Sequence, residues 1–238
     1  LQLDNQSYIF YDSDNYRESA EMLFLHFKLH YYRPVLMAFI SGIPYLFGSS
    51  TSGIYQWSFF VNVFCWLGTS ILVFEFMKNF LKLKWAFVAA IVPFFMVGSA
   101  ALNYHLLTEN IYTFTIIFSF YFLLKYFKTK TFLFLSIALS ILLLSMLIKP
   151  GSKFLALIIC FIFIGQIFKN YKSKASLFIY GSLFLIGVQV FGMKSQYGDY
   201  TISYIDGITY YNYICSKAVC IKEGKLFNSI ENPRADYI

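Results

Sequence analysis

The sequence predicts an all-α polytopic membrane protein with about six transmembrane helices and additional juxtamembrane helices on the extracytoplasmic side. The composition is that of a membrane protein: 58% of the 238 residues are hydrophobic and only 13% are charged, whereas a soluble domain carries about a quarter charged residues. The mean hydropathy of +0.61 points the same way. The net charge of +7 is gathered in short loops between apolar runs, which is typical of membrane topology and argues against a nucleic-acid partner.

Six apolar runs reach or approach the roughly 20 residues that a helix needs to cross a bilayer. They span 55–77, 85–102, 107–126, 131–149, 152–168 and 175–194. Nine of the nineteen Lys and Arg residues lie in three loops that join these runs: Lys78, Lys82, Lys84, Lys125, Lys128, Lys130, Lys169, Lys172 and Lys174. Because basic loops face the cytoplasm, we expect the turns at 103–106 and 149–152 and the C-terminal tail on the other side.

One further apolar run, 34–48, is only fifteen residues long. If it crossed the membrane, the basic loops would all face outward, so we expect a juxtamembrane or re-entrant helix at the outer interface. The chain then divides into an extracytoplasmic loop with amphipathic and interfacial helices (1–53), a transmembrane bundle (54–195) and the start of an extracytoplasmic loop or domain (196–238). Since it begins at Leu1 with a polar stretch, we expect it to be a fragment of a longer protein.

Two carboxylates, Asp12 and Asp14, precede a predicted amphipathic helix over 15–28, in which Asn15 and Glu18 form a box-like capping pattern. One interpretation is that an acid merely caps this helix, which suits Asp14 better than Asp12. The alternative is a carboxylate placed at the outer membrane surface for acid–base chemistry.

Further ionisable residues stand at the outer ends of the apolar runs. Glu109, with His105 just before it, opens one run and is either a first-turn acid or a functional group at membrane depth. Lys149 closes another run at a Lys-Pro-Gly turn, followed by Lys153, and is either a snorkelling lysine or an anchor for a lipid phosphate. Arg33, just before a proline, is either an interface anchor or a phosphate-binding fork.

Other side chains give weaker signals. His26 and His30 have the i, i+4 spacing of a metal pair, but the sequence indicates no third ligand. An extracytoplasmic tail permits a disulfide between Cys215 and Cys220. Three tail tyrosines suit either stacking on sugar rings or β-structure: Tyr204, Tyr210 and Tyr211.

In this order the motifs resemble those of the GT-C glycosyltransferases. They are Asp-Ser-x-x-Tyr-x-x-x-Ala from Asp12, an Arg-Pro helix from Arg33 that closes in Leu-Phe-Gly, Leu-Thr-Glu ending at Glu109, and Lys-Pro-Gly from Lys149. The branch that the chain is most similar to contains the bacterial enzymes like protein O-mannosyltransferases and the aminoarabinose transferase of lipid A, the family 39-like group. The resemblance runs as far as Met193, and the family's chains continue well beyond this length.

The resemblance implies a GT-C-like fold and a glycosyltransferase of the bacterial inner (plasma) membrane. Such an enzyme moves a hexosyl or pentosyl group, with inversion, from a polyprenyl-phosphate sugar to a lipid, glycan or protein acceptor on the extracytoplasmic face. Asp12 takes the position of the family's catalytic base, with Asp14 and Glu109 as further acidic candidates. The implied substrate-binding residues are Tyr16, Arg33, His105, Lys149 and Lys153.

Two departures from the family pattern bear on the chemistry. Lys149 replaces the usual arginine and offers a point charge instead of a bidentate fork. Ser13 stands where a second acid often adjoins the catalytic Asp, so the resemblance implies no certain cofactor and leaves a divalent cation open.

Two rival functions involve the same kind of lipid-linked saccharide, namely a transporter or flippase and a polymerase or ligase. A transporter needs polar residues at mid-membrane, whereas the ionisable residues here gather at the ends of the runs. A non-catalytic scaffold would give no reason for the acid pair.

Overall fold

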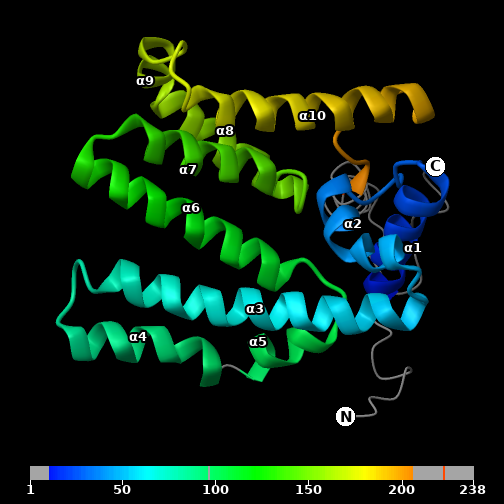
Figure 1. Cartoon of the computed structure of the whole chain (residues 1–238), viewed down its shortest axis with the longest axis horizontal. Helices are drawn as coiled ribbons and strands as arrows, with labels where there is room; N and C mark the ends of the chain where they lie inside the picture. Colours follow the sequence, from blue (N-terminus) through cyan, green and yellow to red (C-terminus); the bar gives the residue numbers. More distant parts are fainter. Residues whose placement is uncertain (1–10, 96, 206–221, 223–238) are drawn as a thin grey trace.

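The computed structural model describes residues 11–95, 97–205 and 222, and within these ranges the chain is helical and contains no strand (Figure 1). The predicted all-helical class is therefore confirmed for the described part. Because apolar side chains dominate the helices, many large hydrophobic residues remain exposed on the outside of the bundle, as expected where lipid and not water is the solvent.

The N-terminal elements form a compact unit at one end of the molecule (Figure 1). They are α1 (Tyr11–His26), α2 (Val35–Gly42) and the short 3-10 helix η2 (Ile43–Phe47). The apolar run 34–48 is thus broken into two short helices, and α2 packs against α1. The indole nitrogen of Trp57 donates to the carbonyl of Ile40 at 2.8 Å and ties α2 to the next helix.

Three described helices are long and apolar enough to cross a membrane. They are α3 (Thr51–Met77), α6 (Glu109–Thr129) and α10 (Ser176–Tyr197). They correspond to the predicted runs 55–77, 107–126 and 175–194, and Glu109 begins its helix as expected.

The other three predicted runs contain shorter described helices. Their elements are α4 (Leu83–Phe95), α5 (Val97–Ala101), η3 (Leu102–Tyr104), α7 (Phe132–Ser145), η4 (Pro150–Ser152), α8 (Lys153–Ile162) and α9 (Ile164–Lys169). Pro93 lies inside α4, where it removes a backbone hydrogen bond close to the end of that helix. Phe163 separates α8 from α9, so the run 152–168 forms two helices instead of one.

Packing in the bundle centres on α7, which lies between α6 and α10 (Figure 1). Leu135, Leu139 and Leu142 on α7 have no exposed surface. Hydroxyl groups join its two neighbours to it: Ser119 of α6 donates to a carbonyl of α7 at 2.9 Å, and Ser140 of α7 meets a serine of α10 at 2.5 Å. Small hydroxyl-bearing residues allow such close helix contact in an apolar surrounding.

The basic loops lie together at the end of the bundle away from α1 and α2 (Figure 1). The connections α3–α4, α6–α7 and α9–α10 all reach this end. Lys128 donates a hydrogen bond from Nζ to the side-chain oxygen of Asn79, which joins two of these connections. The molecule therefore has a basic end and, opposite to it, an end that carries the N-terminal unit.

Candidate functional site

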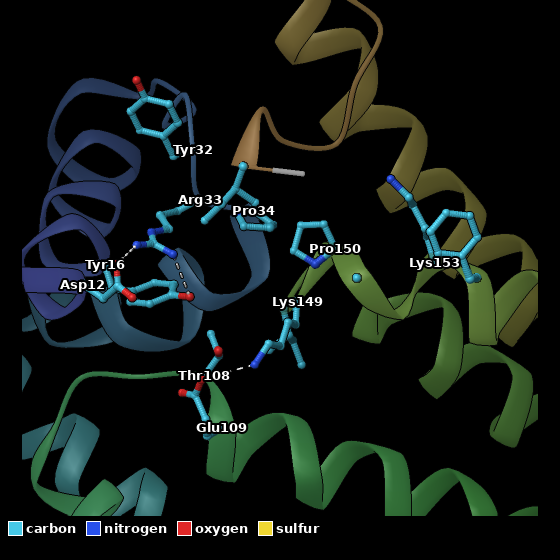
Figure 2. A pocket seen from close by; sticks show the side chains of 14 residues that line it. Asp12, Tyr16, Tyr32, Arg33, Pro34, Thr108, Glu109, Lys149, Pro150 and Lys153 are labelled. Carbon is cyan, nitrogen blue, oxygen red and sulfur yellow. Dashed lines mark hydrogen bonds and ion pairs between the residues drawn. The ribbon is translucent and has the colours of Figure 1, made fainter. Parts of the chain in front are cut away.

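A cavity of about 490 Å³ opens between the N-terminal unit and the facing ends of α6, α7 and α8 (Figure 2). Six of the eight residues proposed from the sequence line it: Asp12, Tyr16, Arg33, Glu109, Lys149 and Lys153. They come from segments more than a hundred residues apart, and the fold brings them to one place. The cavity is the natural candidate for a binding or active site.

The first charged pair in the cavity joins α1 to the segment before α2. Nη2 of Arg33 donates to Oδ1 of Asp12 at 2.5 Å, and Nη1 donates to the hydroxyl of Tyr16 at 3.2 Å. The guanidinium carbon also lies 4.3 Å from the centre of the Tyr16 ring, a cation–π contact. The Arg33 side chain is only 7% exposed, whereas that of Asp12 is 51% exposed. The cation is thus held rigidly while the carboxylate stays accessible.

The second charged pair joins the start of α6 to the turn after α7. Nζ of Lys149 lies 3.2 Å from Oε1 of Glu109 and 5.7 Å from the centre of the Tyr112 ring. Both partners are partly exposed, at 46% and 39%. Within the described part of the chain, the other oxygen of Glu109 is buried without a hydrogen-bond partner. A partly exposed pair of this kind is weak and exchanges partners at low cost.

Tyr16 and Thr108 lie between the two charged pairs (Figure 2). A hydrogen bond links their side chains, and burial is the main cause that raises the pKa of Tyr16 above its ordinary value, opposed chiefly by the positive charge of Arg33. The phenol therefore remains protonated at neutral pH and acts as a fixed polar group in the wall.

Two prolines shape the backbone on either side of the cavity. Pro34 precedes α2 with φ −68° and ψ 154°, and Lys149 is extended at φ −137° and ψ 105° before Pro150 begins η4. A residue before proline avoids the helical region, so the turns that follow α7 stop at Lys149, whose side chain lines the cavity. The N–H of Leu36 donates to the carbonyl of Leu147 at 3.2 Å and joins the two walls directly.

The structure places two of the proposed residues elsewhere. Asp14 faces α3, where Oδ1 accepts a hydrogen bond from the hydroxyl of Tyr55 at 3.3 Å and lies 3.6 Å from Nε of Arg17. His105 does not line the cavity; its backbone carbonyl accepts from Asn62 Nδ2 at 2.9 Å.

The prediction that α1 begins at Asn15 is wrong. Asp12 and Asp14 already lie in the first turn of α1. They therefore project from different sides of one helix, which explains why only one of them reaches the cavity.

The described residues contain no group of three or more His, Cys, Asp and Glu side chains that suits a metal ion. His26 ends α1 and His30 lies beyond it, so the helical i, i+4 pair suggested by their spacing does not form. Tyr204 stacks on Tyr31 with ring centres 4.0 Å apart. The remaining tail candidates lie outside the described residues: Cys215, Cys220, Tyr210 and Tyr211.

Sequence reasoning missed several residues of the cavity wall. Thr108 stands inside the Leu-Thr-Glu motif and was open to prediction from it. The cavity is also lined by Tyr32, Phe154 and Ile205. The position of Ile205 depends on tertiary contacts that no local sequence pattern predicts. One such contact is the hydrogen bond from Ser203 Oγ to the carbonyl of Tyr32 at 2.5 Å.

Comparison with protein-family models, curated proteins and solved structures finds no match for this chain.

Proposed function

We propose that this protein is an inverting membrane glycosyltransferase of the GT-C type, which transfers a sugar from a polyprenyl-phosphate donor to an acceptor on the extracytoplasmic face of a bacterial plasma membrane. In this proposal α4–α5, α7 and α8–α9 cross the membrane together with the three long helices. Short or broken helices can do so where the bilayer thins or flanking residues reach the interface.

The observation that carries the proposal is the meeting of three cations and two carboxylates in one cavity, at the end of the bundle opposite to the basic loops. The basic loops favour the cytoplasmic side, which would place the cavity at the extracytoplasmic surface. A lipid-linked sugar presents a phosphate and an apolar tail at that depth, and the cavity has cations for the first and apolar side chains for the second.

The cations suit the leaving group. When the bond between the sugar and the phosphate breaks, negative charge grows on the phosphate, and fixed cations stabilise it. Arg33 is already held in place by Asp12 and Tyr16. Lys149 would exchange the partly exposed carboxylate of Glu109 for the phosphate, and Lys153 lines the same cavity.

The carboxylate of Asp12 suits the acceptor. A hydroxyl is a weak nucleophile, and a carboxylate within hydrogen-bond reach takes its proton as the new bond to the sugar forms. Oδ1 of Asp12 is oriented by Arg33 while half of the side chain remains exposed. One displacement of this kind inverts the configuration at the sugar carbon.

An apolar wall suits the lipid tail. Ile148, Pro150 and Phe154 line the cavity, and Phe154 is 66% exposed. A prenyl chain entering from the side of the bundle would cover the exposed ring of Phe154, which gives the donor binding energy away from the reacting bond.

The charge distribution favours surface chemistry over transport. In α3, α6, α7 and α10 every charged residue lies within the first or last five residues of its helix. A transporter for a charged substrate would be expected to carry charged groups at mid-membrane.

The proposal is tested by incubating the full chain in lipid nanodiscs with radiolabelled undecaprenyl-phosphate hexoses and pentoses, and by measuring cleavage of the sugar–phosphate bond. We expect Asp12→Asn to reduce the rate by about 100-fold or more, as for the loss of a general base. The matched control is Asp14→Asn, two residues away and outside the cavity, with a change of less than about threefold. Equal rates for the two variants, or no cleavage by the wild type, would contradict the proposal.

A further inference from the structure

His30 is buried beside the cavity and caps the turn that leads to Arg33. Its side chain is 6% exposed. Nδ1 accepts hydrogen bonds from the backbone N–H groups of Tyr32, at 3.1 Å, and Arg33, at 3.2 Å. A ring nitrogen that accepts two N–H donors carries no proton, so the imidazole is neutral with its proton on Nε2.

The groups around His30 act on its charge in opposite directions. Nε2 lies 3.8 Å from Oε2 of Glu18 on α1, a side chain that is 58% exposed. The Tyr32 ring is centred 5.9 Å from the imidazole, and the positive charge of the Arg33 guanidinium also acts on it. Burial and, to a smaller extent, Arg33 lower the pKa of His30, and they outweigh the opposing effect of Glu18.

The turn capped by His30 is also held from the C-terminal side of the chain. The hydroxyl of Tyr197 donates to the carbonyl of Leu29 at 2.7 Å, and Gln196 Oε1 accepts from the N–H of Leu29 at 2.9 Å. The phenol of Tyr197 is the titratable group that α10 contributes to this region. Residues 29–33 are therefore held from both sides, and the backbone N–H groups of Tyr32 and Arg33 depend on His30 for their acceptor.

We propose that His30 is a positioning residue, which holds Arg33 in the cavity only while its imidazole is neutral and so makes the site sensitive to acid. A proton on Nδ1 would point at two N–H donors that can no longer pair with it. The turn must then open, and Tyr32 and Arg33, which both line the cavity (Figure 2), move with it. The inference deepens the proposed function, because Arg33 is there a phosphate ligand.

Two substitutions separate the hydrogen-bonding role of His30 from its charge. In His30→Asn the side-chain oxygen can accept the same two N–H groups, as asparagine does in turns, and it does not titrate. In His30→Leu the space is filled but the acceptor is lost. His26→Asn is the control, because His26 is an exposed residue at the end of α1.

The first measurement is the affinity of undecaprenyl phosphate for the full chain in nanodiscs, from neutral to mildly acidic pH. We expect His30→Leu to bind about tenfold or more weakly at neutral pH, the scale of two lost hydrogen bonds, and His30→Asn to bind within about threefold of the wild type. The phosphate itself titrates near pH 6, and this affects both proteins alike. The test is therefore the affinity of the wild type divided by the affinity of His30→Asn at each pH. This ratio should fall on acidification, and a constant ratio would overturn the proposal.

The second measurement does not depend on any ligand. The chain has three histidines, so ¹⁵N NMR of labelled histidine, with His26→Asn as an aid to assignment, reports the tautomer of His30. We expect an unprotonated Nδ1 and a protonated Nε2 at neutral pH. A proton on Nδ1 there would overturn the inference. If this tautomer is found while undecaprenyl phosphate does not bind the wild type, the capped turn stands and the proposed function fails.

Discussion

Gly42, near the end of α2, provides a test of how α1 and α2 place the two groups of the first charged pair. A Cβ added at Gly42 would lie 2.3 Å from Cδ2 and 2.4 Å from Cε2 of the Phe24 ring on α1. Ordinary contact begins at 3.4 Å, so the ring edge or the whole of α1 has to move by about 1 Å. Phe24 packs on the rings of Phe39 and Tyr45, at 5.8 and 6.4 Å, and cannot turn away without losing these contacts.

The expected cost of Gly42→Ala follows from these contacts. Forcing extra volume into a packed contact costs about 1–3 kcal/mol, and alanine recovers up to about 1 kcal/mol of helix propensity. With the full recovery the net destabilisation is at most about 2 kcal/mol, which lowers the Tm of a chain of this length by up to roughly 8 °C. The rate of donor cleavage should fall by more than the loss of folded protein explains. A shift of α1 against α2 moves Asp12, which lies on α1, relative to Arg33, which precedes α2.

The assay is thermal unfolding in detergent together with the rate of donor cleavage. The control is Gly181→Ala in α10, where an added Cβ meets nothing within 4 Å and the Tm should not fall. If Gly42→Ala keeps both the Tm and the activity of this control, the reasoning about the α1–α2 contact is refuted.

Three further predictions concern single side chains. Lys149→Met should weaken undecaprenyl-phosphate binding about tenfold or more, the scale of a charge-assisted hydrogen bond, while Lys172→Met at the basic end should leave it unchanged. Equal effects of the two substitutions would contradict the role of Lys149 as a phosphate ligand. Asn62→Leu should destabilise the chain by about 1–3 kcal/mol in a thermal melt, because the partly buried carbonyl of His105 loses its donor. Stability should fall as the pH drops below the ordinary imidazole pKa of about 6.5: the unfolded chain then takes up a proton at His30 that the fold excludes, since burial lowers the folded pKa. A melt series in which His30→Asn shows the same fall would contradict this last prediction.

The features that could be predicted from the sequence are those set by composition and by local chemistry. The length of the apolar runs predicted α3, α6 and α10. The positions of Glu109 at a helix start and of Lys149 before a proline also follow from local rules. Six of the eight proposed residues share one cavity because these rules placed their segments at the same end of the bundle.

The features that could not be predicted depend on contacts between distant segments. Which of the two acids lines the cavity depends on the orientation of α1, which directs Asp12 toward Arg33 and Asp14 toward Tyr55. The role of His30 depends on a turn whose N–H groups have no signal in the sequence.

The account depends most on where the phosphate of a lipid-linked sugar binds, since the chain has cations at both ends of the bundle. The most direct measurement is a cryo-EM structure of the full chain in nanodiscs with undecaprenyl phosphate bound. We predict that the phosphate lies in the cavity, within hydrogen-bond reach of Arg33 and Lys149 and with its tail along Phe154. A phosphate bound instead among Lys78, Lys128 and the other lysines of the basic loops would contradict the account.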